Sequence, residues 1–195
     1  MKRRLYLVRH AEVRDKGRFH GSTDVELSEK GLRQAQRLAE RARDWNPDRL
    51  AGSDLKRVRQ TARPLAQHLG LELHVDPDLR ECHFGRWENL SWEEIEQLDP
   101  GPAAAFLKDW VRNGAPQGET MEQMWRRVQA AWRRQWETSW RRLVLVGHAG
   151  TNLLLLAHFL EMPLSNLFRI RCDYTTVAVV DFKEGVPQLI SLQRD

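Results

Sequence analysis

Two histidines occupy matching places in the sequence, each just beyond a short apolar run. Arg9 and His10 follow the run 5–8 in LYLVRHAE, and His148 follows the run 143–146 in LVLVGHAG. A continuous apolar run of this length is typical of a strand buried on both faces. Because open parallel sheets bind ligands beyond the carboxyl ends of their strands, both imidazoles are expected in one crevice.

Two arginines are expected beside these histidines. Arg9 directly precedes His10, and Arg57 comes just after a short expected strand at 49–53, at the start of a helix. Two guanidinium groups and two imidazoles would make an electropositive pocket. Its natural guest is a phosphate, because arginine presents a planar fork of donors to the phosphate oxygens. A lone histidine is most often structural, but two matched strand ends with an adjacent arginine favour a functional site.

A zinc site is the alternative chemistry for the same histidines. Zinc requires three or four ligands, usually with one closely spaced pair. His10 and His148 have no His-x-x-x-His or aspartate-rich motif beside them, and Cys82 and Cys172 lie far apart in the sequence. We therefore expect two free thiols, no bound metal and no cofactor.

The hydrophobic pattern predicts strands that alternate with helices. Further strands are expected at 71–75, 175–182 and 188–192, and helices at 28–42, 55–69, 121–140 and 152–160. Pro64 predicts a kink or a break in the second helix. This alternation implies an α/β fold, namely a three-layer α/β/α sandwich with a mostly parallel central sheet, in a single domain over residues 1–195.

Residues 76–118 are less regular, hold four prolines and contain only short helical pieces. We expect a short cap-like insertion around 82–118 that covers the pocket and sets substrate specificity. The aromatic side chains of this segment either line the pocket or pack the cap, and they are Trp87, Trp92, Phe106 and Trp110.

Charge and apolar patterning argue against two classes of partner. Lys and Arg number 31 against 27 Asp and Glu, so the net charge of +4 is too small to indicate nucleic-acid binding. The stripe of apolar side chains in the helix 121–140 is expected in the core, and the paired arginines beside it are expected on a solvated face. No apolar run approaches the roughly 20 residues of a membrane span, so we expect a cytoplasmic protein with no membrane partner.

Five segments, taken in order, resemble the histidine phosphatase superfamily, which includes the cofactor-dependent phosphoglycerate mutases. They are LVRHAE at 7–12, GSTDVELSEKG at 21–31, SDLKRVRQTA at 53–62, LRECHFGRWE at 79–88 and VGHAG at 146–150. Each segment alone is a weak signal, whereas five in the right order span nearly the whole chain. The resemblance implies the same α/β fold and phosphoryl-transfer chemistry.

The resemblance also implies a role for each matching residue. His10 is the nucleophile and becomes phosphorylated on a ring nitrogen. Arg9 and Arg57 clamp the phosphoryl oxygens, and His148 donates a further hydrogen bond to the phosphoryl group. Glu81 is the general acid for the leaving alcohol and then the base for water. Neutral imidazole is a good nucleophile near pH 7, and phosphoryl transfer needs mainly positioning and charge stabilisation.

Several positions depart from the family pattern. Ala11 and Ala149 stand where glycine is commoner, and Val13 stands where threonine or serine is usual, so we expect an added methyl beside the phosphate and a lost hydroxyl. Arg59 is not expected to take part, because the family spacing to the following threonine selects the arginine two residues earlier. His20 is expected either at the pocket mouth or in an ordinary loop position.

The short cap and the sequence around the expected general acid favour a phosphomonoesterase, with water as acceptor, over a phosphoglycerate mutase. They look most like the alpha-ribazole phosphatases and broad-specificity bacterial phosphatases. The expected partner is a small phosphorylated metabolite, for a monomer or a homodimer. Two other classes stay open. One is a phosphate-ester binding protein that has lost catalysis. The other is a nucleic-acid binder that uses the arginine-rich helix.

Overall fold

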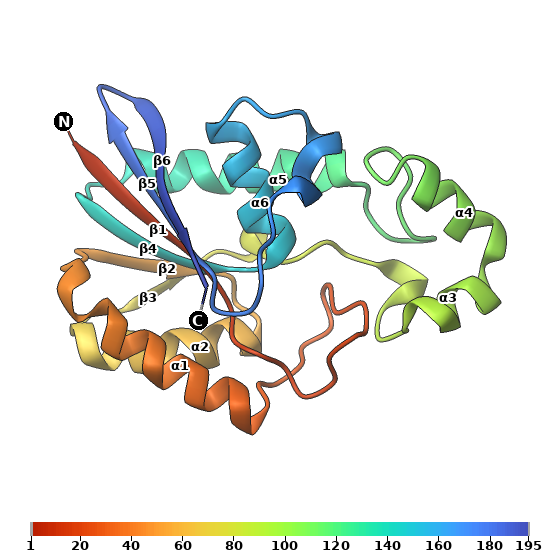
Figure 1. The fold of residues 1–195 in the computed structure, drawn as a ribbon, viewed down its shortest axis with the longest axis horizontal. Helices are drawn as coiled ribbons and strands as arrows, with labels where there is room; N and C mark the ends of the chain where they lie inside the picture. Colours follow the sequence, from red (N-terminus) through yellow and green to blue (C-terminus); the bar gives the residue numbers. More distant parts are fainter. Residues whose placement is uncertain (1, 195) are drawn as a thin grey trace.

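A six-stranded sheet forms the centre of the protein in a computed structural model that describes residues 2–194 (Figure 1). The strand order is β3-β2-β4-β1-β5-β6. The strands are β1 Arg3–Arg9, β2 Arg49–Gly52, β3 Leu73–Val75, β4 Arg142–Gly147, β5 Val177–Lys183 and β6 Val186–Gln193. The first strand of the chain therefore lies in the middle of the sheet, between two strands from its last third.

The sheet is mixed, with a parallel majority. β1 pairs with β4, β4 with β2 and β2 with β3, all in parallel, whereas β5 runs antiparallel to both β1 and β6. The antiparallel pair arises because Glu184 and Gly185, both with positive φ, close a two-residue hairpin between β5 and β6. The expectation of a mostly parallel sheet is thus roughly right.

Helices cover both faces of the sheet, as Figure 1 shows. They are α1 Glu29–Arg41, α2 Lys56–Leu69, α3 Trp92–Leu98, α4 Pro100–Lys108, α5 Met121–Glu137 and α6 Ala149–Phe159. Side chains of α1 and α2 share one buried cluster with Tyr6 and Val8 of β1. Side chains of α5 and α6 share another with Leu5 and Leu7 of the same strand. This is the alternation of a strand that is buried on both faces.

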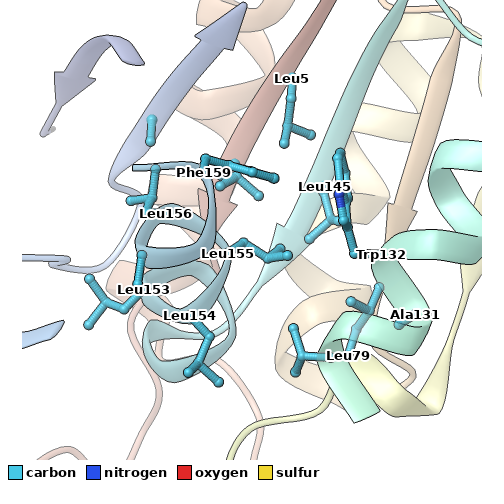
Figure 2. Close-up of a cluster of buried hydrophobic side chains, with 14 of the residues drawn as sticks. Leu5, Leu79, Ala131, Trp132, Leu145, Leu153, Leu154, Leu155, Leu156 and Phe159 are labelled. Atoms are coloured by element: carbon cyan, nitrogen blue, oxygen red, sulfur yellow. The ribbon is translucent and has the colours of Figure 1, made fainter. Parts of the chain in front are cut away.

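The larger core lies between the sheet and the pair α5–α6, and Figure 2 shows part of it. Leu5 and Leu145 project from neighbouring strands toward Trp132 of α5 and Leu155 of α6. All four side chains are at least 94% buried. The apolar stripe of α5 therefore packs in the core as expected, and α6, which is almost entirely buried, anchors the end of β4.

Residues 82–118 carry α3 and α4 and a small core of their own. Trp87 and Ile95 are fully buried there, and Phe106 and Trp92 pack against them. The indole Nε1 of Trp87 donates a hydrogen bond of 2.9 Å to the carboxylate of Asp99. Trp87, Trp92 and Phe106 therefore hold the segment together, whereas Trp110 packs against the core under α5 and α6. In Figure 1 the segment projects from one end of the sandwich.

Three local expectations differ from the structure. Pro64 lies inside α2 without breaking it, because Val58 and Leu65 on either side of the proline both pack against the sheet. α5 ends at Glu137, so Trp140 reaches the core from the following loop, where its indole donates to the carbonyl of Gln135. α6 begins at Ala149, three residues earlier than the sequence pattern predicts.

Candidate active site

The register of the sheet brings the two histidines together. Arg9 of β1 stands opposite Gly147 of β4, and the backbone N–H of His10 donates a 2.9 Å hydrogen bond to the carbonyl of Gly147. The rings of His10 and His148 lie 5.2 Å apart, centroid to centroid, at 63°. A cavity of about 220 Å³ opens beside them, lined by Arg9, His10, Val13, Arg18, Phe19, His20, Arg57, Glu81, Phe84 and Tyr174.

His10 is 95% buried and has a defined tautomer. Its Nδ1 lies 2.8 Å from the carbonyl oxygen of Ala11. A carbonyl oxygen can only accept, so Nδ1 carries the proton and Nε2 keeps its lone pair. Burial holds the pKa of His10 well below its usual value, and the charges of Arg57 and Arg9 lower it further. The imidazole is therefore a neutral base with one free nitrogen.

Arg57 is the second residue of α2 and is 99% buried. Its guanidinium donates to the carbonyl oxygens of Thr23 at 2.8 Å, Gly21 at 2.6 Å and His20 at 3.1 Å. These three acceptors belong to one loop, between β1 and α1. The loop thus holds the guanidinium rigidly at the cavity wall, although its oxygens carry no full charge to neutralise it.

Glu88 in turn holds that loop, which the sequence did not reveal. Its carboxylate accepts the backbone N–H groups of Gly21, Ser22 and Thr23 at 3.1, 2.9 and 3.0 Å. Burial acts to raise the pKa of Glu88, but hydrogen bonds from the Thr23 hydroxyl and from backbone N–H groups outweigh it and keep the pKa low. An ionised Glu88 therefore organises the carbonyls that grip Arg57.

His148 lies behind Arg57 and is fully buried. Its Nδ1 accepts a 3.2 Å hydrogen bond from Nε of Arg57, and its Nε2 lies 2.7 Å from the hydroxyl of Ser53. Because arginine can only donate, Nδ1 is unprotonated and Nε2–H donates to Ser53. Burial and the charge of Arg57 keep the pKa of His148 well below its usual value. Ser53 is a second contact that the sequence did not reveal.

Glu81 lines the cavity and rests on the first turn of α6. Its Oε2 accepts the backbone N–H of Gly150 at 3.0 Å, and its Oε1 accepts that of Cys82 at 3.0 Å. A Cβ at position 150 would lie 2.2 Å from Oε1, so only glycine allows this approach. Arg127 of α5 donates to the carbonyl of Glu81 at 2.8 Å and forms an ion pair with Glu119.

Arg9 reaches the same cavity by a different route. Its Nη1 donates to the carbonyl of Cys172 at 2.6 Å, and its Cζ lies 4.3 Å from the centre of the Tyr174 ring. That ring is also 5.5 Å from the ring of His10. Tyr174 was not found from the sequence because it precedes β5 in a loop without a recognisable motif. It packs Arg9 and the nucleophile candidate against one another.

The departures from the family pattern have small effects on the cavity. The methyl of Ala11 packs in a buried cluster with Val13, Leu27 and Ala35, and Ala11 is not among the residues that line the cavity. Val13 lines the cavity, in the place where the usual threonine or serine would present a hydroxyl. Arg59 lies outside the cavity and donates to the backbone of Asp54.

His20 lies at the cavity mouth, beside Arg18 and Phe19. Its Nδ1 is 2.9 Å from Oδ1 of Asn89, and its Nε2 contacts the carbonyl of Asp15. Of the cap residues, Phe84 lines the cavity, whereas the expected aromatic group of Trp87, Trp92, Phe106 and Trp110 does not. The mouth is therefore formed jointly by the loop after β1 and the segment around Phe84.

Metal-ligating side chains do not gather anywhere within residues 2–194 in groups of three or more. Within the same residues, the helices are too short or too polar to cross a bilayer. The cavity thus offers cationic donors, a neutral imidazole and one carboxylate. Such a set suits a tetrahedral oxyanion bearing a leaving group.

Comparisons with known proteins agree with this geometry. The model of the histidine phosphatase superfamily (branch 1) matches residues 5–195. The adenosylcobalamin/alpha-ribazole phosphatase of Salmonella typhimurium is 33% identical over 95% of this chain and 94% of its own. A probable phosphoglycerate mutase of Enterobacter sp. is 31% identical over 93% of this chain and 86% of its own.

Solved structures give the same result. The alpha-ribazole phosphatase of Shigella flexneri superposes with a TM-score of 0.92 and 28% sequence identity, over 98% of this chain and 96% of its own. The family match and the shared fold both extend over essentially the whole chain. The protein therefore belongs to the histidine phosphatase superfamily, branch 1.

Proposed function

We propose that this protein hydrolyses phosphate monoesters of small metabolites through a phosphohistidine at His10. One observation carries the proposal, namely a neutral, buried imidazole whose free Nε2 stands among the guanidinium groups of Arg9 and Arg57. Those two cations attract and clamp the phosphoryl oxygens. Such clamps contribute about 10³-fold or more to phosphoryl transfer, so no further electrophile is required.

The reaction divides into two displacements. In the first, the Nε2 lone pair of His10 forms the N–P bond while the P–O bond to the alcohol breaks, and Glu81 gives the departing oxygen its proton. In the second, the Glu81 carboxylate takes a proton from water as the water oxygen attacks phosphorus. The N–P bond then breaks, its electron pair returns to Nε2, and inorganic phosphate leaves.

His148 acquires its donor role only when the anion binds. In the free protein its Nδ1 accepts from Arg57 and carries no proton. His148 is not among the residues that line the cavity. Burial keeps the pKa of His148 low, and the charges of Arg57, Arg127 and Arg9 lower it further. A phosphate dianion offsets those charges and raises the pKa of His148, so that Nδ1 takes up a proton and donates to a phosphoryl oxygen once the Nε–H of Arg57 has moved off it. Ser53 holds the ring in place during this exchange.

Water is the acceptor we favour over a second phosphoglycerate. The cavity of about 220 Å³ is small, and Phe19, Phe84 and Tyr174 add aromatic rings to a wall whose other side chains are mostly charged or polar. Arg18, the further cation at the mouth, already pairs with Glu94 at 2.7 Å. With Arg9 and Arg57 engaged by the phosphoryl group and Arg18 paired with Glu94, this lining favours a leaving group without a carboxylate over phosphoglycerate. Alpha-ribazole phosphate, named in several relatives, is one candidate substrate.

The remaining features of the proposal concern partners and setting. We place the enzyme in the cytoplasm, as a monomer or a homodimer without a nucleic-acid partner. Arg127 and Arg134 of α5 form ion pairs with acidic side chains, which argues against nucleic-acid binding by this helix. A phosphate-binding protein without catalysis is the less favoured class, since the methyl of Ala11 leaves the cavity unobstructed.

The test is hydrolysis of p-nitrophenyl phosphate together with detection of the intermediate. The wild-type protein should turn over in the presence of a chelator. Denaturation at alkaline pH during turnover should leave one phosphoryl group on the peptide that contains His10. His10→Ala should abolish both signals, whereas His68→Ala, at an exposed site on α2, should change neither. Turnover that survives His10→Ala would overturn the proposal, and preferential mutase activity with 3-phosphoglycerate would overturn the choice of acceptor.

A further inference from the structure

Buried polar atoms without partners are concentrated beside the active site. Among residues 2–194, the buried side-chain atoms without a hydrogen-bond partner are Arg9 Nε, Asn152 Nδ2, Asn152 Oδ1 and Thr176 Oγ1. Asn152 is 2% exposed and Thr176 is 1% exposed. Leaving a buried polar group unpaired destabilises the folded state, so three such side chains require an explanation.

The sheet register places these three side chains next to one another. Arg9 lies opposite Gly147 on one side, and on the other its backbone N–H donates to the carbonyl of Thr176. A Cβ on Gly147 would come within 2.7 Å of Oδ1 of Asn152. The asparagine amide therefore fills the space that a side chain at 147 would occupy, directly beside Arg9.

All three side chains also face the same side of the sheet. Leu5 and Leu7 of β1 point into the core under α5 and α6, as do Ala178 and Val180 of β5. Because side chains alternate along a strand, Arg9 and Thr176 continue those two rows on the same face. Asn152 comes down onto this face from α6, one turn after His148, whose carbonyl accepts its backbone N–H at 3.0 Å.

We infer that Asn152 and Thr176 are positioning residues for Arg9, an inference that rests on the proposed phosphatase function. One buried water accepts the Nε–H of Arg9 and donates to Oδ1 of Asn152 and to Oγ1 of Thr176. Buried waters typically make about three such hydrogen bonds to groups otherwise unsatisfied. Tyr174 stacks on the guanidinium and Cys172 accepts from Nη1. This network fixes the Nε edge of the Arg9 guanidinium, so that the remaining N–H groups of Arg9 point toward the phosphoryl group.

Asn152→Leu tests the inference, because it removes the amide at similar volume. We expect the inhibition constant of orthovanadate and the KM for p-nitrophenyl phosphate to rise about tenfold, the value of one hydrogen bond to a charged group. The unfolding temperature should change little, because the leucine fills the same buried volume as the asparagine. Thr176→Val, another change of similar volume, should show a weaker effect in the same direction and serves if Asn152→Leu does not fold.

A double-mutant cycle separates positioning from a general packing effect. The Arg9→Lys variant lacks the Nε–H of arginine. Adding Asn152→Leu to this variant should therefore change the inhibition constant of orthovanadate less than twofold. Leu156→Met, one turn further along α6, is the packing control and should behave like wild type. Wild-type kinetics in Asn152→Leu, or an equal effect in both backgrounds, would overturn the inference while the wild-type enzyme still hydrolyses its substrate. A wild type without phosphatase activity would instead overturn the proposed function.

Discussion

At the scale of single residues, the same cations serve His10 in two ways. Arg9 and Arg57 would bind the phosphoryl group, and their charge, added to burial, keeps the imidazole unprotonated. The Ala11 carbonyl meanwhile fixes the proton on Nδ1. A nucleophile with a lowered pKa and a fixed tautomer needs no separate base to activate it. We infer that phosphate affinity and nucleophile readiness depend on one pair of side chains.

Arg57→Lys is the sharpest test of the clamp. Lysine keeps the positive charge but loses the fork of donors that contacts Thr23 and Gly21 and faces the cavity. We expect kcat/KM for p-nitrophenyl phosphate to fall at least 100-fold. The unfolding temperature should fall as well, because buried loop carbonyls lose their donors. The matched control is Arg59→Lys, two residues along the same helix and outside the cavity, which should keep wild-type kinetics. Equal losses in both variants would remove Arg57 from its proposed role.

Residue types and spacing single out four residues that the fold brings to one cavity, namely Arg9, His10, Arg57 and Glu81. Arg9 and His10 follow a visible strand, and Glu81 lies in a recognisable segment. The supporting contacts could not be found in this way. Glu88 acts on backbone N–H groups of a distant loop, and Tyr174 acts through a ring face. Neither interaction leaves a local pattern, because it depends on which loops the fold brings together.

At the scale of elements, the loop between β1 and α1 is the main support of the site. Its carbonyls hold Arg57, while its N–H groups are held by Glu88 from the cap segment. Ser28 then ends the loop by capping α1 through the N–H of Gly31 at 2.9 Å. The loop therefore transmits the position of the cap segment to the phosphate clamp.

Glu88→Gln should loosen this loop. The amide keeps the shape but replaces one acceptor with a donor, which then faces the N–H groups of Gly21 to Thr23. We expect the unfolding free energy to fall by about 1–3 kcal/mol and KM to rise about tenfold, with a smaller change in kcat. Glu96→Gln, at an exposed position in α3, provides the control. Unchanged KM in a folded Glu88→Gln would show that the loop does not support the clamp.

Element boundaries were less predictable than element types. The apolar pattern identified the core-facing stripe of α5, but the helix stops at Glu137. Trp140 then reaches the same core from a loop. Likewise Pro64 predicts a kink or a break, whereas α2 runs unbroken from Lys56 to Leu69, with residues on both sides of the proline packed against the sheet. The apolar periodicity of the sequence predicts which side chains become buried. It does not show whether the last of them, here Trp140, lies in the helix or in the loop that follows.

At the scale of the whole molecule, two buried neutral histidines make stability depend on pH. The pKa values of His10 and His148 are held well below the ordinary value in the folded state. As pH falls through about 6.5, the unfolded chain binds protons at both positions and the folded protein does not. Unfolding is therefore favoured as the pH falls, until the lowered pKa values of the folded state are reached.

The free energy of unfolding in urea should decline between pH 7 and pH 5. Each histidine contributes a slope of up to about 1.4 kcal/mol per pH unit. Most carboxylates titrate at lower pH and contribute little in this range. His148→Gln should remove about half of the slope. His68→Gln, on the exposed side of α2, should leave it unchanged. A flat profile in the wild type would mean that neither imidazole stays neutral when folded.

The central place of β1 has a consequence for synthesis. The strand that ends just before His10 pairs with β4 and β5, so both of its neighbours are made long after it leaves the ribosome. Contacts of such large sequence separation form slowly, and they leave β1 without its first partner until translation has passed Gly147 and without its second until translation has passed Lys183. A nascent chain stalled anywhere before that point would expose an apolar ribbon to chaperones, and it could not yet carry a phosphoryl group.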